Sequence, residues 1–378
     1  MRQLRVYRFL VRVAAMSWKE SLHIQRDPRT LVLTLVMPVL LLLIFGFGIS
    51  FDLDHIPLAI ADGDRTVESR ALVNAMIASQ DFDRVANVRP EAAEELFRRG
   101  RTLGALIIKP GYGRHLARRE TADVELLVDG ADANSANTVL QKALAIASAH
   151  GAHLVQRLLP AASPPIEVRT WIRYNPEARS AVFLVPGLSA FLLALGAVLL
   201  TALTIAGEWE SGSMEQLFAS PVGRFEVVLG KLVPYLALGI CQLLLVVAMG
   251  STVFDVPIRG SMIVLFVFGF VFLVGMLAQG LLISVLARNQ MVATQAGLLS
   301  SLLPSLLFSG MLFPIANMPR VFQWISAAIP ARYLVHAMRG VLLKGNGFEH
   351  LWPSIIPIVV FAAIVLALTT TRFKRRIV

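Results

Sequence analysis

The chain has 378 residues, of which 56% are hydrophobic, and its mean hydropathy is +0.67. Soluble domains are typically about 45–50% apolar, so an ordinary soluble globular protein is excluded. The formal net charge is +10, but the basic residues flank apolar segments and form no patch on a folded domain, so nucleic-acid binding is not expected. The one cysteine, Cys241, lies in an apolar run and can form no intrachain disulfide.

Residues 1–30 are predicted to be a cytoplasmic leader containing an amphipathic helix that lies in the membrane interface. Within 3–24, arginines alternate with apolar and aromatic residues at helical intervals. A solvated basic leader is the alternative. The apolar stretch 31–51 that follows is longer than a signal-peptide core of about 7–15 residues, and no small-residue cleavage site comes after it. We therefore expect an uncleaved membrane anchor.

Residues 52–178 form the one polar stretch long enough for a soluble domain. Short apolar runs typical of strands alternate in it with helical patterns. The predicted strands cover 56–62, 82–88, 103–109 and 122–130, and the predicted helices cover 66–80, 91–99, 112–119 and 133–158. This order predicts a small α/β or α+β sheet domain.

Six apolar stretches, counting 31–51, are long enough to cross about 30 Å of hydrocarbon as helices. The other five lie at 182–206, 232–254, 262–286, 293–315 and 353–371. An even number of crossings places both ends of the chain on one side. Because basic residues are concentrated in 1–30 and in the tail 372–378, we expect both termini to be cytoplasmic and 52–178 to be extracytoplasmic.

An acidic segment, GEWESGSMEQLFASP, follows the second predicted span and opens a loop expected over 207–226. It carries Glu208, Glu210 and Glu215, and no basic residue up to Pro221. Ser213 and the glutamine three residues later have capping-box spacing, which predicts a short helix over 213–220. Because the other cytoplasmic ends are basic, this charge indicates contact with a soluble partner. A well-capped connector between two spans is the alternative.

The stretch 316–350, between the last two spans, is placed on the extracytoplasmic side although it holds several basic residues, which the positive-inside rule disfavours there. These are Arg320, Arg332, Arg339 and Lys344. Polar and apolar residues alternate here at helical spacing, so we expect re-entrant or interfacial helices whose basic side chains reach toward water.

Sequence patterns indicate no catalytic residue, metal or cofactor on this chain. His150 and His153 lie three residues apart on a helix, but no third metal ligand accompanies them. The sequence GRFEVVLGKL at 223–232 fails the G-x-x-x-x-G-K-[ST] pattern of a phosphate-binding loop, so ATP chemistry would belong to another chain. The centres of the six spans carry no charged residue, which disfavours an ion-coupled carrier.

Three stretches in the expected order resemble the ABC-2 type permeases, the integral membrane subunits of bacterial ABC exporters, and specifically their multidrug-efflux-like branch. Residues 208–235 are similar to the family's coupling segment, residues 309–345 to its region between the last two spans, and 56–73 with 126–134 to its extracytoplasmic domain. The coupling pattern falls on Glu208, Glu210, Gly212, Ser213, Glu215, Leu217 and Pro221. Trp209 and Ser211 depart from the residues common between its acidic positions.

The resemblance implies a membrane all-α fold of six helices with an N-terminal interfacial helix, an ABC-2 transmembrane domain over 182–376 and an α/β extracytoplasmic domain. It further implies a multi-pass protein of the bacterial inner (plasma) membrane, in contact with membrane lipids. A separate ATP-binding cassette subunit, which binds ATP and Mg²⁺, would dock on helix 213–220. A second permease chain, identical or paralogous, would form the path with this one, lined chiefly by 182–206 and 293–315.

The implied activity is export of hydrophobic or amphiphilic, drug- or lipid-like cargo, with a periplasmic adaptor as a further partner where the cell has an outer membrane. Two alternatives stay open: a non-transporting ATP-driven envelope module and an ion-coupled secondary transporter. Nothing in the apolar spans selects one cargo over another.

Overall fold

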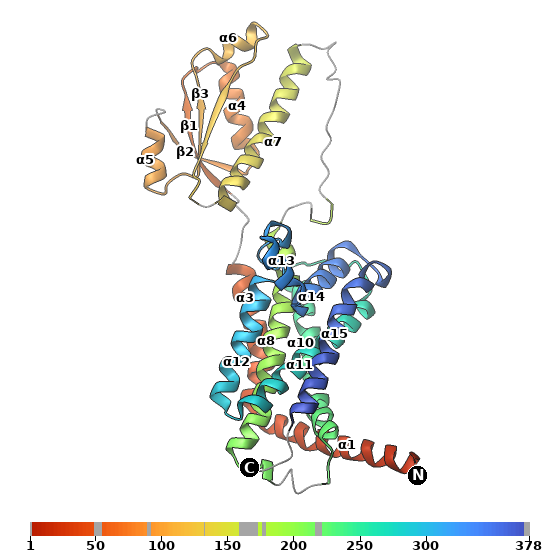
Figure 1. Ribbon diagram of the computed structural model, residues 1–378. Coiled ribbons are helices and arrows are strands. Elements are labelled where there is room, and N and C mark those ends of the chain that lie inside the picture. The colour runs from red at the N-terminus through yellow and green to blue at the C-terminus, as the bar shows by residue number, and fades with distance from the viewer. Residues whose placement is uncertain are drawn as a thin grey trace. The chain divides into compact units, whose positions relative to one another are not determined.

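The computed structural model describes residues 2–48, 55–88, 92–131, 133–158, 173–175, 179–215 and 221–373. The chain divides into two compact units (Figure 1). One unit joins Met1–Ile49 to Ile172–Val378 and is a bundle of helices, and the other, Ser50–Trp171, is a small sheet with helices on its faces.

Four of the described helices are long and apolar enough to cross a membrane. They are α8 (Ser180–Glu210), α10 (Arg224–Val253), α11 (Met262–Ala287) and α15 (Phe348–Arg372). In its most apolar window, 78% of α8 is buried inside the bundle. It packs against α3, α10, α11, α12 and α14, so α8 is the central helix around which the others are arranged (Figure 1).

The first and fifth predicted spans form shorter helices. Residues 31–51 contain a π-helical turn, η1 (Val32–Val36), that continues into α3 (Met37–Gly48). The fifth span forms α12 (Gln290–Leu307), so its predicted end at 315 was wrong. The chain leaves the helix after Phe308, and Gly310 takes up the left-handed conformation with φ of 78°. Six membrane crossings therefore stay a prediction. Four helices among the described residues are long and apolar enough to cross a membrane.

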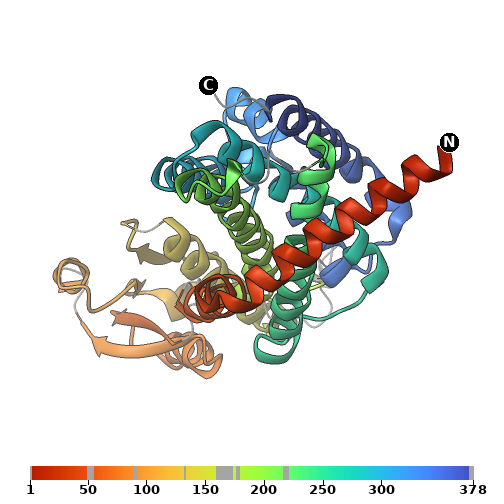
Figure 2. The ribbon, with the colours of Figure 1, turned by 90° about the horizontal axis from the view of Figure 1, so that it is seen from below.

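The N-terminal segment is a single helix, α1 (Arg2–Arg26), followed by the short α2 (Pro28–Leu31). Seen from below, α1 runs across the ends of the other helices of the bundle (Figure 2). Met16, Glu20 and Ile24, each four residues from the next, are buried on one face, and α1 packs on α10. Tyr7 and Trp18 are exposed on the other side. This arrangement has the amphipathic character that the leader sequence predicted.

Between α12 and α15 the chain forms short helices, as the helical spacing of 316–350 predicted. They are η3 (Ile315–Asn317), α13 (Arg320–Ala327), α14 (Pro330–Arg339) and the π-helical η4 (Gly340–Lys344). Of these, α14 packs on α8, α11 and α15 and buries Leu334, Val335 and Met338. The segment is therefore part of the bundle's core.

The second unit holds a four-stranded sheet in the order β2-β1-β3-β4. The strands are β1 (Ile56–Asp62), β2 (Phe82–Asn87), β3 (Gly104–Ile108) and β4 (Val124–Val128). The helices are α4 (Val67–Ala78), α5 (Ala93–Arg98), α6 (Tyr112–Ala117) and α7 (Ala133–Leu158). β1 pairs in parallel with β2 and β3, whereas β4 runs antiparallel to β3.

Side chains that alternate along β1 divide between the two faces of this sheet. Ile56, Leu58 and Ile60 belong to a core that also contains residues of α4 and α7. Ala59 lies on the other face, packed with Ala93 of α5. All four strands fall inside the ranges that the sequence predicted. β1 and β3 are nearly continuous apolar runs, which is typical of strands buried on both faces.

Candidate functional site

The central helix α8 continues to Glu210, so a loop predicted to begin at 207 was placed too early. Glu208 and Glu210 lie in the last helical turn. Gly212, with φ of 72°, turns the chain, and the Ser213 hydroxyl donates to the Glu208 carbonyl oxygen at 3.3 Å. Residues 214 and 215 are helical again. Leu217, the capping glutamine and the rest of the predicted helix 213–220 lie outside the described residues, and Pro221 leads into α10.

A group of charged side chains, here named the basal cluster, joins the end of α8 to α1 and α10. It consists of Lys19, Glu20, Glu208, Lys231 and Tyr235. The Lys231 Nζ atom lies 3.1 Å from a carboxylate oxygen of Glu20 and 3.1 Å from one of Glu208. Tyr235 donates its hydroxyl to the other Glu20 oxygen at 3.0 Å, and Lys19 Nζ approaches Glu208 at 3.4 Å. Three helices thus meet through one network.

Burial makes this network energetically demanding. The Lys231 side chain is 1% exposed and that of Glu20 is 5% exposed, and an unpaired ion in such surroundings costs several kcal/mol (about 3–5 when one partner is removed). Two cations and two carboxylates balance each other, which offsets that cost. The Glu208 Oε2 atom is buried and accepts no hydrogen bond from the described residues. A buried oxygen of this kind is usually hydrogen-bonded, so Glu208 Oε2 is available to accept a hydrogen bond from another donor.

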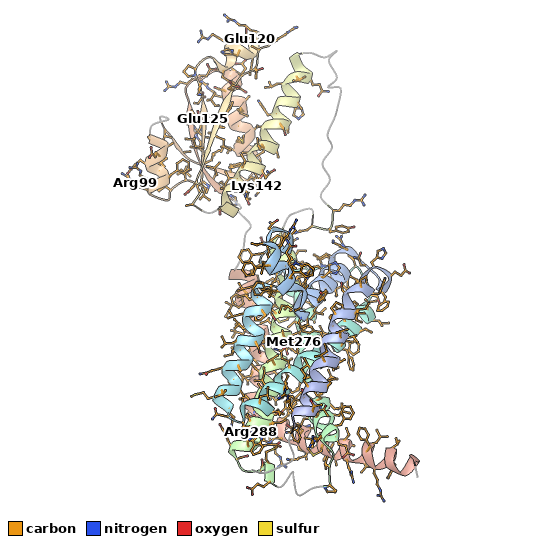
Figure 3. The ribbon with its side chains drawn as sticks, viewed as in Figure 1. Arg99, Glu120, Glu125, Lys142, Met276 and Arg288 are labelled. Carbon is orange, nitrogen blue, oxygen red and sulfur yellow. The ribbon has the colours of Figure 1, made fainter. Side chains whose placement is uncertain are left out.

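The second acidic residue, Glu210, connects α8 to α12. Its two carboxylate oxygens accept hydrogen bonds from the backbone N–H of Gln290 at 2.9 Å and from that residue's side-chain amide at 2.7 Å. Gln290 is the first residue of α12, where the helix dipole favours a negative charge. The Arg288 guanidinium lies 4.9 Å from the centre of the Trp209 ring, at the same end of the bundle as α1 (Figure 3). The last turn of α8 is thereby tied to the start of α12.

A further ion pair fixes α1 to the start of α10. Arg12 Nη1 lies 3.5 Å from Glu226, and the same carboxylate accepts the backbone N–H of Gly223, the residue before α10. Lower along the contact, the Ser17 hydroxyl donates to the Gly230 carbonyl oxygen at 3.0 Å. A displacement of the chain between α8 and α10 would therefore act on α1 as well.

The third acidic residue, Glu215, differs from the other two. Its side chain is exposed and makes no ion pair or hydrogen bond with the part of the chain that the structure describes. The neighbouring Met214 is buried at 2% exposure and packs into the core, which anchors this turn. Of the three carboxylates singled out in the sequence, Glu215 is the one without a partner among the described residues.

A cavity of about 630 Å³ adjoins the basal cluster. Its lining includes the polar residues Glu20, Glu208 and Lys231 together with Gln290 of α12, and the apolar residues Leu199, Leu200 and Leu203 of α8. A cavity lined by both charged and apolar side chains suits an amphiphile. No group of three or more His, Cys, Asp or Glu that could hold a metal ion occurs within the described ranges.

Sequence reasoning missed the inner half of this site. Lys231 lies one residue before the predicted third span, and Glu20 lies within the predicted leader 1–30. The signal was present in the spacing: Lys231 and Tyr235 lie four residues apart and so share a helix face, and Glu20 lies on the stripe of α1 that also carries Met16 and Ile24. The contacts of Lys231 with Glu20 and Glu208, which join three helices, could be recognised only from the structure.

Comparison with known families decides what this membrane bundle is. The family described as ABC-2 family transporter protein matches residues 28–371. The chain belongs to the ABC-2 transporter family.

Full-length relatives of this ABC-2 permease come from Escherichia coli strain K12. It is 32% identical to the probable multidrug ABC transporter permease YbhS and 27% identical to the probable multidrug ABC transporter permease YbhR. The first similarity covers 97% of both chains, and the second covers 95% of this chain and 97% of its relative. ABC transporter G family member 20 of Dictyostelium discoideum is 29% identical over 51% of this chain and 27% of its own length.

Membership assigns the chain a general role. It is an integral membrane protein and the transmembrane subunit of an ABC transporter, and the ATPase is not this subunit. The family implies two partners, an ABC ATPase and a second permease chain. The recognition of the family from the coupling segment and the two further stretches is thereby confirmed.

Proposed function

We propose that this ABC-2 permease is the membrane subunit of an ATP-driven exporter that moves hydrophobic or amphiphilic cargo out of the cytoplasm or the inner leaflet. Its site of action is the bacterial inner membrane, with both termini cytoplasmic and residues 52–178 outside. The basic residues at both ends of the chain support this orientation. The relatives named as probable multidrug permeases support a drug-like class of cargo.

The observation that carries the proposal is the division of labour among the three acidic residues. Glu215 is exposed and offers its carboxylate to a basic residue of the ATPase subunit. Glu208 and Glu210, one turn earlier, hold the end of α8 to α1, α10 and α12. Movement of the docked ATPase would therefore reach four helices through short, charged contacts. In this proposal the segment transmits force because Glu215 contacts the ATPase subunit while Glu208 and Glu210 are bonded to neighbouring helices.

The cargo path in this proposal runs between two permease chains along α8 and α12. α12 exposes Leu299 and Leu303, which leaves an apolar face for lipid, cargo or the second chain. The cavity beside the basal cluster, with its Leu and carboxylate walls, would be the inner entrance. The outer domain would lie over the exit and transfer cargo to a periplasmic adaptor where the cell has an outer membrane.

Replacement of Glu215 by Gln tests the coupling role in the assembled complex. We expect docking of the ATPase subunit to weaken roughly tenfold, as for loss of one partner of an interfacial ion pair, and cargo-stimulated ATP hydrolysis to fall with it. The measurement is the ATPase rate against concentration of the ATPase subunit in proteoliposomes. Glu349→Gln, at an exposed carboxylate at the start of α15, is the matched control and should behave like the wild type.

Unchanged docking and unchanged stimulation in the Glu215→Gln complex would contradict the coupling role. Stimulation of ATP hydrolysis without any cargo movement into or out of loaded vesicles would point to a non-transporting envelope module. Transport that persists with an inactive ATPase subunit would point to an ion-coupled carrier.

A further inference from the structure

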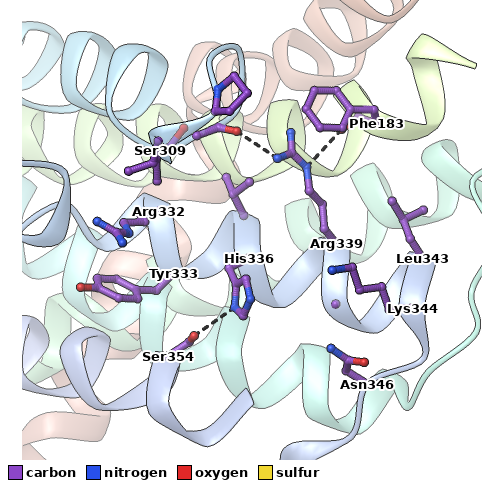
Figure 4. Close-up of a pocket in the computed structure, with 15 residues that line it drawn as sticks. Phe183, Ser309, Arg332, Tyr333, His336, Arg339, Leu343, Lys344, Asn346 and Ser354 are labelled. Carbon is purple, nitrogen blue, oxygen red and sulfur yellow. Dashed lines mark hydrogen bonds between the residues drawn. The ribbon is translucent and has the colours of Figure 1, made fainter. Parts of the chain in front are cut away.

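A second cavity, of about 590 Å³, lies at the end of the bundle where α8 begins (Figure 4). Its walls come from the first turn of α8, the turn after α12, and the helices α14, η4 and α15. Fifteen residues line it, and the family's coupling segment contributes none of them. The cavity is therefore separate from the basal cluster and from the proposed coupling route.

The lining of this cavity is one-sided in charge. Arg332, Arg339 and Lys344 contribute three cationic side chains, and none of the fifteen lining residues is Asp or Glu. In Figure 4 the three side chains surround His336, whose Nδ1 atom lies 3.1 Å from the Ser354 hydroxyl. Positive charge without a counter-ion in a concave site raises the local concentration of anions.

Arg339 is held in place by backbone carbonyl groups. It donates from Nε to Phe183 at 3.3 Å, from Nη1 to Gly310 at 2.9 Å and from Nη2 to Met311 at 3.0 Å. Its guanidinium also lies 3.8 Å from the centre of the Phe183 ring. A guanidinium has five N–H donors, so two remain for a ligand while the group keeps its full charge. The site is preorganised, and no carboxylate among the described residues forms an ion pair with Arg339.

Lys344 and Asn346 supply donors that the fold does not use. Neither side chain makes an ion pair or hydrogen bond with the described residues. Arg332, in contrast, donates to the Gln323 carbonyl and the Ser326 hydroxyl, both at 3.3 Å. A fixed arginine beside a lysine and an amide without partners is an arrangement that recognises phosphate oxygens.

The size and the apolar part of the lining indicate that the anion carries a hydrophobic group. Phe183, Ile315 and Leu343 are among the lining residues of the cavity, which is much larger than a phosphate ion needs. Trp352 and Ile356 on α15 are exposed and apolar, as a surface in contact with lipid would be. We propose that this cavity binds the phosphate of an anionic phospholipid-like amphiphile, with Arg339, Lys344 and Asn346 as its donors.

Binding of short-chain lipids to the purified full-length chain tests this site. Native mass spectrometry in detergent would compare dioctanoyl phosphatidylglycerol with dioctanoyl phosphatidylcholine. We expect tighter binding of the anionic lipid, and roughly tenfold weaker binding after Lys344→Gln or Asn346→Ala, since each removes a hydrogen bond to a charged group. Arg372→Gln, at the far end of α15, removes a charge elsewhere in the bundle and should leave the affinity unchanged.

Competition with inorganic phosphate distinguishes a lipid headgroup from a free phosphate ion as the ligand of this site. Failure of millimolar phosphate to displace phosphatidylglycerol supports an amphiphile. If phosphate binds and lipid does not, and if Lys344→Gln weakens the binding of phosphate, the proposal that the ligand is an amphiphile would be overturned. Equal binding of the two lipids, or equal binding by wild type and both site variants with unchanged thermal unfolding, would overturn the site itself.

Discussion

Lys231 is the residue on which the base of the bundle depends. It is almost fully buried and bridges Glu20 of α1 to Glu208 of α8, with Nζ to oxygen distances of 3.1 Å in both cases. Its removal would leave the carboxylates of Glu20, 5% exposed, and Glu208, 15% exposed, without the cation that they share. The cost of that state, and not the attraction within the intact cluster, is what a substitution would reveal.

Lys231→Met should therefore destabilise the protein by about 3 kcal/mol or more. Lys19→Met is the matched control, because its side chain is 59% exposed and its approach to Glu208 is worth at most about 1 kcal/mol. Thermal unfolding in detergent, followed by intrinsic fluorescence, measures both. Equal unfolding temperatures for the two variants would show that the buried cluster does not hold the helices together.

Asp64, in the sheet unit, carries a pH dependence whose sign is fixed by its hydrogen bonds. The hydroxyl of Thr66 and the backbone N–H groups of Gly113 and Gly111 donate to its carboxylate and lower its pKa below the ordinary value of 3.8. A lowered pKa means that these bonds stabilise the fold above the unfolded pKa, and that the stability is lost as the pH falls through the folded pKa.

Asp64→Asn should lower the free energy of unfolding of the sheet unit at pH 7 by about 1–2 kcal/mol. The difference from the wild type should shrink below a pH of about 4, where the wild-type carboxylate is protonated in the unfolded chain. Urea unfolding of residues 50–171, measured at pH 7 and again below a pH of about 4, tests this prediction. A difference that is the same at both pH values would contradict the assigned role.

At the scale of elements, the contact between α8 and α11 rests on small residues. A Cβ atom added at Gly280 of α11 would overlap the Val198 carbonyl group and the Thr201 hydroxyl of α8. Thr201 also donates to the Leu277 carbonyl oxygen of α11 at 2.8 Å. Close approach of two helix backbones inside a membrane is typical of such small-residue contacts.

Gly280→Ala should force α8 and α11 apart and lower the thermal unfolding temperature, with a loss of about 1–3 kcal/mol, as for overpacking of a close-packed core. Gly151→Ala, at a helical position with open space around it, is the control and should have no such effect. The comparison is again thermal unfolding of the full chain. Wild-type stability of Gly280→Ala would show that the two helices can separate without cost.

Elements with a clear local sequence pattern could be predicted from the sequence. Helix ends that are set by tertiary contacts could not. The strands β1 to β4 fall within their predicted ranges, and short continuous apolar runs mark β1 and β3. α12 ends before the predicted 315 because of the left-handed turn at Gly310, and α8 continues to Glu210 because its last turn is held by Lys231 and Gln290. Sequence identified the three acidic positions, but their division into two inner residues and one outer residue arises from contacts far apart in the chain.

At the scale of the whole molecule, the bundle combines a fixed base with a free contact point. The segment that we propose as the coupling segment joins α8 to α10, and the basal cluster and Glu210 connect the same region to α1 and α12. A push on this segment therefore acts on the central helix, which contacts most of the bundle. This is the property expected of a membrane subunit that receives its energy from another chain.

ATP-dependent export is the measurement that tests this account most directly. Proteoliposomes containing the permease, its second chain and the ATPase subunit would be loaded with a fluorescent amphiphilic dye, and dye movement would be followed after addition of ATP. The account predicts that movement requires ATP, stops when the ATPase subunit's catalytic carboxylate is replaced, and is not restored by an imposed proton gradient. Dye movement that continues with the inactive ATPase subunit would contradict it.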